Sequence, residues 1–528
     1  MPSPLAQPPP DSDPSRWRLA PWLLVAAATL ALAAFAFLHV REGVFASGDG
    51  GLKFLLTRQF AAGRFDLAVP EPTAAWARQL WAAGLAPFGP PFAYPVAAHW
   101  QIAFPLLLPL LSAPLWAALG PAGLYLLPLA GVTAALVGTC LMARRLGAGT
   151  VATATALCLT LASPLPLYGA MFWEHAPAAG LLALGTAALL AESPRTVTVG
   201  GLLVGLAAAL RPESLVFVGL LLPALLATRP TQRTPLLWAV AALAVALAGP
   251  IGVNLAASGS LTGLHGQQFQ FAWRLGWAQE QALLAMLLGC FPALVVAAPA
   301  VALGQQPQLA AVARAALGAV LVVPWLVPNT GGHQIGPRYL LIFVPVLAAL
   351  AATLTEWTWR TQRLRLATPV VLLVLAAATW SGTLAVGTFR PAFASDCATR
   401  IAPTLEFLRA RPERVIAFSH QWNAQEFAAL MDDRVFLRLQ RWGGARAIDE
   451  DAEVDTERQW HSLVTTLRAH GVLQFLLVTF PEQRVPPVRA TTAGAVRFSR
   501  VFAAGQCVVW LAALAPAVDA APGIPTGS

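Results

Sequence analysis

Residues 19–38 read LAPWLLVAAATLALAAFAFL, and this stretch decides the class of fold. It contains no charged residue, and its length matches the roughly 20 residues that an α-helix needs to cross the hydrocarbon core of a bilayer. Arg16 and Arg18 precede it, after a Pro-rich leader of the kind that stays disordered. A cleaved signal peptide has a shorter apolar core and a small-residue cleavage site, so we predict an uncleaved first transmembrane helix.

The composition extends this interpretation to most of the chain. Of 528 residues, 57% are hydrophobic and only 11% are charged, and the mean hydropathy is +0.63. A soluble domain carries roughly 25% charged residues. The net charge of +9 does not indicate nucleic-acid binding, because excess arginine in a membrane protein reflects its cytoplasmic loops, and no aromatic-rich basic groove or zinc spacing is present.

Further apolar runs bring the expected number of transmembrane helices to about eleven. They cover residues 121–143, 150–170, 176–191, 197–210, 214–228, 235–254, 281–303, 311–328, 339–355 and 367–388. Another run, 101–119, is ambiguous because it contains Pro105, Pro109 and Pro114, which a regular helix tolerates poorly.

The positive-inside rule decides how this ambiguous run is treated. If 101–119 does not cross, the arginine-rich short loops all fall on one side, the cytoplasm; if it crosses, every later cluster faces outward. The arginines concerned are Arg16, Arg18, Arg144, Arg145, Arg195, Arg229, Arg233, Arg314, Arg360, Arg363 and Arg365. We therefore predict that 101–119 is a juxtamembrane helix in the outer interface, and that all eight histidines lie at the outer face.

The resulting architecture is an all-α polytopic bundle with a small C-terminal α/β domain outside the membrane. We expect a disordered cytoplasmic leader at 1–18, a transmembrane domain at 19–388 with an outer loop at 39–120, and a periplasmic domain at 389–528 with a flexible tail from about 516. In the last domain, strand-like runs at 414–418, 472–480 and 506–514 alternate with helical stretches near 401–411, 424–431 and 453–469. Cys397 and Cys507 flank this region, and they are either a disulfide, as an oxidising compartment permits, or two separate buried thiols.

The first candidate site is Ser47-Gly48-Asp49-Gly50-Gly51-Leu52-Lys53, directly after the first span. A carboxylate at a membrane boundary suggests a function, and glycines let backbone approach a ligand closely. Asp49 is a candidate base for deprotonating a hydroxyl, and Lys53, the only lysine in the chain, is a candidate phosphate ligand. The alternative is a polar turn in which the aspartate caps the next helix.

Three further groups carry polar residues at predicted outer ends of spans. Glu174 and His175 could position an acceptor or tune a base, or could simply form a polar cap. His333, Arg338 and Tyr339 belong to GGHQIGPRY at 331–339, where the guanidinium fork suits phosphate oxygens or else snorkels to the surface.

Arg211, in Arg211-Pro212-Glu213, is either a second phosphate partner or the ion-pair partner of Glu213. His265, Gln267 and Gln268 could bind a sugar. The adjacent acids Asp432 and Asp433 indicate a solvated turn rather than a metal site.

Taken together, these residues resemble the GT-C superfamily of membrane glycosyltransferases, which includes protein O-mannosyltransferases and the aminoarabinose transferases of lipid A. The resemblance covers about residues 20–390 and the outer C-terminal domain. It implies that Asp49 corresponds to the first-loop acid proposed as catalytic base, and that Glu174 takes the place of a second acid. It also implies that Arg338-Tyr339 corresponds to an Arg-Tyr pair opening a late helix, and Arg211 to a basic residue at the end of the fifth span.

Two features depart from the family pattern. Asp49 stands alone where relatives often carry paired acids, so we predict no metal ligands, although a divalent ion stays an alternative. Pro90-Pro91-Phe92 only loosely matches a Pro-Pro-Leu motif that is usually accompanied by lysine.

The function that the resemblance implies is transfer of a sugar from a polyprenyl-phosphate donor to an acceptor hydroxyl of a glycan, lipid or protein. The reaction would take place at the periplasmic face of a bacterial inner membrane. A transporter or flippase of lipid-linked glycans is the alternative, although it needs polar residues through the bilayer midplane that are nearly absent here. A non-catalytic scaffold for envelope assembly is a third possibility.

Overall fold

The computed structural model describes residues 15–39, 41–97, 99–266, 273–298, 306–327, 336–362, 375–376, 379, 396–439, 456–481, 483, 485–505 and 507–515. The chain divides into two compact units. The helical unit comprises Met1–Leu38, Tyr125–Pro250 and Phe269–Arg390. The sheet unit comprises His39–Leu124, Ile251–Gln268 and Pro391–Ser528, so it groups the long first loop with the C-terminal segment.

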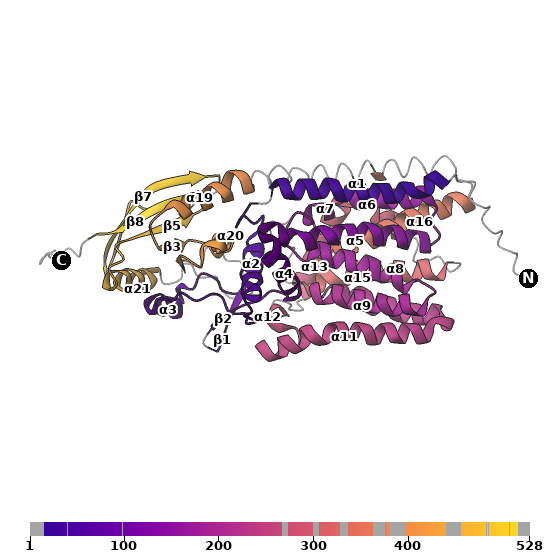
Figure 1. The fold of residues 1–528 in the computed structure, drawn as a ribbon, viewed down its shortest axis with the longest axis horizontal. Coiled ribbons are helices and arrows are strands. Elements are labelled where there is room, and N and C mark those ends of the chain that lie inside the picture. Colours follow the sequence, from indigo (N-terminus) through magenta and orange to yellow (C-terminus); the bar gives the residue numbers. More distant parts are fainter. Residues whose placement is uncertain are drawn as a thin grey trace, which may run out of the picture. The chain divides into compact units, whose positions relative to one another are not determined.

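The helical unit is a bundle whose helices run alongside one another (Figure 1). Its helices are α1 (Ser15–His39), α5 (Gly123–Arg145), α6 (Thr150–Ala162), α7 (Leu165–Tyr168), α8 (His175–Leu189), α9 (Pro194–Leu210), α10 (Ser214–Thr228), α11 (Arg233–Ser258), α13 (Trp273–Cys290), α14 (Leu294–Ala297), α15 (Pro307–Leu326) and α16 (Val344–Gln362). Each predicted run up to residue 355 therefore contains helix, whereas most of the run at 367–388 lies outside the described residues.

Small residues let these helices pack closely. A Cβ atom added at Gly131 of α5 would collide with backbone atoms of Pro177 in α8, and one at Gly201 of α9 would collide with the carbonyl of Ala239 in α11. Helices in lipid gain little from burying apolar side chains against each other, so close backbone approach and the resulting van der Waals contact stabilise their association.

Four helical stretches in the described part of the chain are long and apolar enough to cross a membrane, namely Leu19–Leu38, Leu107–Arg145, Pro230–Ser258 and Pro307–Leu326. Five apolar helices of 10–17 residues accompany them, so the expected number of eleven crossings is not confirmed. Leu23 and Leu30 on α1 and Val245 on α11 are each at least 67% exposed. Exposed apolar faces of this kind are unfavourable in water and fit contact with lipid.

The predicted span at 281–303 has different bounds in the structure. Helix α13 begins at Trp273 and ends at Cys290, just before Pro292. Proline lacks an amide hydrogen and crowds the preceding turn, which accounts for the break. As a result Glu280, which the prediction left outside the span, lies within a helix and is almost fully buried.

The sheet unit contains a six-stranded mixed sheet, which confirms the predicted C-terminal sheet domain. Its strand order is β4-β3-β5-β8-β7-β6, with β3 parallel to β4 and β5 and the other neighbours antiparallel. The strands are β3 (Val415–Phe418), β4 (Val435–Arg438), β5 (Gln474–Thr479), β6 (Val488–Thr491), β7 (Gly494–Ala504) and β8 (Cys507–Leu514), and the C-terminal helices are α19 (Ala402–Ala410), α20 (Gln421–Glu426) and α21 (Thr456–Ala469). All four side chains of β3 are buried, as expected for a central strand covered on both faces.

The first loop contributes helices and a hairpin to the same unit. They are α2 (Gly48–Ala61), α3 (Ala75–Leu80), a π-helical turn at Trp81–Leu85, α4 (Leu107–Leu119), and the antiparallel strands β1 (Ala93–Val96) and β2 (His99–Ile102). The predicted juxtamembrane segment 101–119 thus contains α4, which packs against α2 and is separated from α5 by a 3-10 turn at Gly120–Ala122.

The structure has no disulfide between the two flanking cysteines, and only Cys507 is buried, since Cys397 is half-buried. Cys507 is fully buried, with its Sγ atom 3.9 Å from Nη1 of Arg400, which also forms a two-pronged ion pair with Glu426 at 2.6 and 2.9 Å.

Candidate functional site

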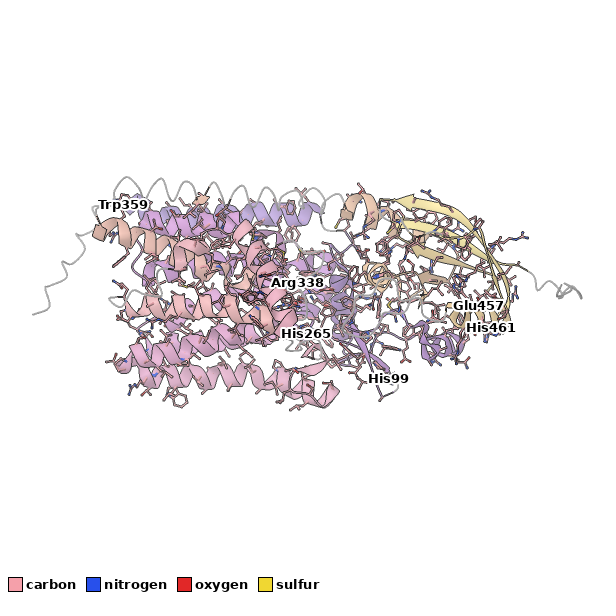
Figure 2. All side chains as sticks on the ribbon, turned by 180° about the vertical axis from the view of Figure 1, so that it is seen from behind. His99, His265, Arg338, Trp359, Glu457 and His461 are labelled. Carbon is pink, nitrogen blue, oxygen red and sulfur yellow. The ribbon has the colours of Figure 1, made fainter. Side chains whose placement is uncertain are left out.

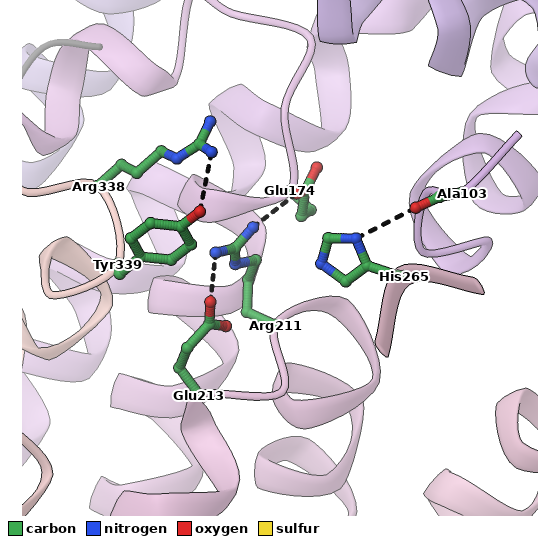
Figure 3. A network of polar contacts seen from close by, with 7 residues as sticks. All are labelled: Ala103, Glu174, Arg211, Glu213, His265, Arg338 and Tyr339. Atoms are coloured by element: carbon green, nitrogen blue, oxygen red, sulfur yellow. Dashed lines mark hydrogen bonds and ion pairs between the residues drawn. The ribbon is translucent and has the colours of Figure 1, made fainter. Parts of the chain in front are cut away.

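The helical unit holds a buried ion-pair cluster of three residues, Glu174, Arg211 and Glu213, which we name the Arg211 cluster. Each residue lies at the end of a helix: Glu174 precedes α8, Arg211 follows α9 and Glu213 precedes α10. Arg211 donates from Nη1 to Oε1 of Glu174 at 3.1 Å and from Nη2 to Oε1 of Glu213 at 2.5 Å (Figure 3). The sequence spacing suggested only the Glu213 pair, and the structure adds Glu174 from 37 positions upstream.

The three residues of the Arg211 cluster are almost completely buried. Glu174, Arg211 and Glu213 are 2, 3 and 4% exposed. Burial alone lowers the pKa of Arg211, but the adjacent carboxylates of Glu213 and Glu174 outweigh it and raise that pKa above its ordinary value. Since both carboxylates already bind the guanidinium, the structure favours the ion-pair alternative for Arg211 over a phosphate ligand.

A second arginine lies next to this cluster. Arg338 donates from Nη2 to the hydroxyl of Tyr339 at 2.9 Å (Figure 3). Its Cζ atom is 4.8 Å from the ring centroid of Tyr339 and 5.7 Å from that of Trp173, while the Cζ atom of Arg211 is 5.3 Å from the centroid of the Tyr339 ring. Arg338 is half-buried, unlike the almost fully buried Arg211.

Aromatic rings from two segments continue the cluster. The ring centroids of Tyr168, Trp173 and His175 lie 5.1–5.6 Å from one another. His175, which was expected to orient an acceptor, is 1% exposed in this aromatic group. His333 and the rest of 331–335 lie outside the described residues.

In the sheet unit, Asp49 and Lys53 lie on one face of α2, because residues four apart in an α-helix are neighbours. Asp49 is in the first turn and partly exposed, where the partial positive charge of the helix N-terminus stabilises a carboxylate. Lys53 is 1% exposed, with its Nζ atom 4.7 Å from the ring centroid of Phe104. His265 donates from Nδ1 to the carbonyl oxygen of Ala103 at 3.1 Å, and Gln267 and Gln268 lie outside the described residues.

The glycines around Asp49 have a different role from the one expected. A Cβ at Gly48 would lie 2.6 Å from Oε1 of Gln425, and one at Gly51 would collide with the backbone carbonyl of Gln425. These glycines therefore admit α20, rather than a ligand, against α2. The acid Asp432, expected in a solvated turn, is 44% exposed and pairs with Arg58 of α2.

Solved structures of other proteins share the fold of this chain. No protein-family model and no curated protein matches the sequence. The crystal structure of ArnT from Cupriavidus metallidurans bound to undecaprenyl phosphate matches with a TM-score of 0.57 and 12% identity, covering 93% of this chain and 98% of that chain. ArnT in the apo state matches with a TM-score of 0.55 and 13% identity over 94% and 98%. ArnT is a GT-C superfamily member. The chain has the GT-C fold.

An archaeal oligosaccharyltransferase, AglB from Archaeoglobus fulgidus in complex with an inhibitory peptide and a dolichol-phosphate, also matches. Its TM-score is 0.49 and its identity 11%, over 86% of this chain and 69% of that chain. The two ArnT structures confirm the predicted GT-C resemblance at the level of the fold.

Two other buried charged residues of this fold were not predicted as site residues. Glu280 is a buried carboxylate on α13, and an acid beside an apolar run could have pointed to it. Arg438 of β4 is 4% exposed beside two tryptophans from the first loop, and no sequence spacing connects residues so far apart. Within the described residues, no group of three or more His, Cys, Asp or Glu is arranged to hold a metal ion.

Proposed function

We propose that this protein is a membrane glycosyltransferase that moves a sugar from a polyprenyl-phosphate donor to an acceptor hydroxyl. The observation that carries the proposal is the fold shared with ArnT over nearly the full length of both chains, in a structure of ArnT that holds undecaprenyl phosphate. The apolar helices and their exposed apolar faces suit a substrate with a lipid tail.

The proposed reaction needs one base and one anion-stabilising group. The acceptor oxygen attacks the anomeric carbon, the bond from that carbon to the phosphate oxygen breaks, and the lipid phosphate leaves with the electron pair. We assign the proton of the acceptor hydroxyl to Asp49, because a partly exposed carboxylate can meet an incoming hydroxyl.

Arg338 is the proposed phosphate ligand. A guanidinium offers a planar fork for phosphate oxygens and stabilises the negative charge that develops on the leaving group. Its half-buried position beside Tyr339 supports this role better than the position of Arg211, whose two terminal nitrogens bind carboxylates. Glu174 then acts as a positioning residue that fixes Arg211, while Lys53, His175 and His333 stay candidate substrate ligands.

The test compares wild type with two aspartate variants in membranes. Each preparation receives a panel of radiolabelled polyprenyl-phosphate sugars, and consumption of each donor is followed. We expect Asp49→Asn to lose at least about 100-fold in rate, the size of effect typical for a general base, whereas Asp433→Asn, an exposed acid of the same unit, keeps wild-type activity. Undiminished transfer by Asp49→Asn would overturn the assignment of Asp49 as the base. If wild type consumes none of the donors, the proposed glycosyltransferase activity is contradicted.

We further propose that the protein lies in a bacterial inner membrane with its N-terminus in the cytoplasm and its C-terminal domain in the periplasm, as the arginine distribution suggests. A membrane-impermeant thiol reagent applied to spheroplasts should label a cysteine introduced at the exposed Thr465 of α21. Labelling only after the membrane is broken would reverse the orientation.

A further inference from the structure

The first loop and β4 enclose a cavity of about 350 Å³ in the sheet unit. Its lining residues are Trp81, Ala82, Gly84, Pro95, Ala97, His99, Trp100 and Arg438. None of them is a predicted site residue, and none has a role in the proposed transfer. We call this cavity the Trp81–Trp100 pocket.

The walls of the pocket are aromatic and firmly held. Trp81 is 4% exposed and donates from Nε1 to the carbonyl oxygen of Phe436 at 2.8 Å. Trp100 is half-buried on β2, directly opposite Pro95 on β1. Indole rings offer broad apolar faces on which the C–H face of a sugar ring can pack, and their fixed orientation lowers the entropic cost of binding.

A buried cation forms another part of the lining. Arg438 is 4% exposed, and its Nη1 donates to Oε1 of Gln421 at 3.2 Å. The same Gln421 oxygen accepts from the amide of Gly89 at 3.0 Å, and a Cβ at Gly89 would lie 3.1 Å from Nη2 of Arg438. The two Nη atoms are almost equally close to that Cβ position, at 3.1 and 3.2 Å, so the guanidinium is held with this edge against Gly89. A guanidinium fixed in this way offers its charge and N–H groups to a carboxylate or phosphate.

The backbone around the pocket is irregular in two places. Trp81–Leu85 forms a π-helical turn that contains Gly84 at φ 94°, and Ala97 adopts φ 54°, a left-handed conformation that is unfavourable for alanine. Local strain and single π turns of this kind are frequent at functional sites. At the rim, His99 projects from β2 (Figure 2), with its Nδ1 atom 2.7 Å from Oε1 of Glu71.

We propose that the Trp81–Trp100 pocket binds a saccharide ring that carries an acidic substituent, either a carboxylate or a phosphate. The two indoles contact the ring, Arg438 binds the anionic group, and the His99–Glu71 pair meets hydroxyls at the rim. The volume lies at the low end of ordinary small-ligand pockets and suits one ring rather than a chain. This binding does not depend on the proposed transfer reaction.

The test is saturation-transfer NMR on the full chain in lipid nanodiscs, which avoids detergents with sugar headgroups. The probes are glucuronic acid, glucose 6-phosphate and glucose. We expect wild type to bind at least one anionic probe about tenfold more tightly than glucose, and the two anionic probes distinguish a uronate from a sugar phosphate. Binding of neither anionic probe, or equal binding of glucose, would overturn the proposal.

A matched pair of variants locates the site without removing a packing residue. Ala82→Phe places a ring inside the pocket, whereas Ala83→Phe adds the same ring at the adjacent exposed position outside the lining. We expect Ala82→Phe to weaken binding at least about tenfold and Ala83→Phe to leave it unchanged. Equal binding by Ala82→Phe and wild type would show that the probes do not bind in the Trp81–Trp100 pocket. Arg438→Gln should abolish the preference for the anionic probes over glucose, and retention of that preference would contradict the role of Arg438.

Discussion

Replacement of Gly51 by alanine tests the packing that presents Asp49. Gly51 lies two residues after Asp49 on α2, and its Cα faces the backbone carbonyl of Gln425 in α20. The added Cβ would come closer than the 3.0 Å that real Cβ atoms respect, and the obstacle is backbone, which cannot rotate away. The two helices must therefore separate.

The expected magnitude follows from two opposing contributions. Alanine gains about 0.5–1 kcal/mol over glycine within a helix, but forcing a methyl group into a packed interface costs about 1–3 kcal/mol. The net loss of up to about 2.5 kcal/mol should lower the apparent Tm by several degrees, at about 2–4 °C per kcal/mol for a unit of this size. Because α2 carries Asp49 and Lys53, we expect sugar transfer to fall as well.

The control is a helical glycine with open space around it. Gly219 of α10 has no atom within 4 Å of an added Cβ, so Gly219→Ala should keep or slightly raise the apparent Tm. Melting curves of both variants are measured in the same detergent, alongside donor consumption by membranes. If Gly51→Ala has the same apparent Tm as Gly219→Ala and wild type, α2 does not pack on α20 in the way described.

Two further predictions address burial. Arg211→Met leaves the buried carboxylates of Glu174 and Glu213 without their cation, which typically costs about 3–5 kcal/mol. Thermal melting should show a large loss of Tm for this variant, whereas Arg195→Met, at an exposed position, should keep the wild-type Tm. The same Tm for both variants would contradict the ion-pair cluster. Burial raises the pKa of the Cys507 thiol to about 11, so only about a thousandth of it is thiolate at pH 8, and thiolate is the reactive form. Iodoacetamide should therefore label Cys507 far more slowly than half-buried Cys397 by mass mapping, and a disulfide-linked pair of peptides would contradict this structure.

The sequence predicted those parts of the fold that depend on runs of one residue type. Strands β3, β5 and β8 lie inside the apolar runs at 414–418, 472–480 and 506–514, because buried strands need continuous apolar side chains. Strands β6 and β7 were not predicted. They pair at one end of the sheet and lack a continuous buried apolar run: Val488 of β6 is exposed, and β7 carries the exposed Arg497 and Arg500, so hydrophobicity alone does not mark these strands.

The candidate site was less predictable because its pairs join distant residues. Arg211 and Glu213 are two positions apart and could be paired from the sequence, but Glu174 could not, since only the packing of α8 against α9 brings it to Arg211. Trp81, Trp100 and Arg438 meet for the same reason, through the hydrogen bond from Trp81 to Phe436 and the contacts of Arg438 at Gly89. Pairings of this kind depend on tertiary structure, which local patterns do not encode.

Asp49 and Glu174 differ in their exposure to solvent, although the sequence suggested similar roles for them. Asp49 and Glu174 each follow an apolar run and lie near the start of a helix, so the sequence made both candidates for a catalytic carboxylate. Glu174 is 2% exposed and binds Arg211, and moving its proton would require a charge change inside a buried ion pair, which is costly. Asp49 is partly exposed in the first turn of α2, where a substrate hydroxyl can approach and the helix N-terminus stabilises the carboxylate. A proton acceptor has to meet its substrate, which is why we propose Asp49 rather than Glu174 as the base and propose that Glu174 holds Arg211 in place.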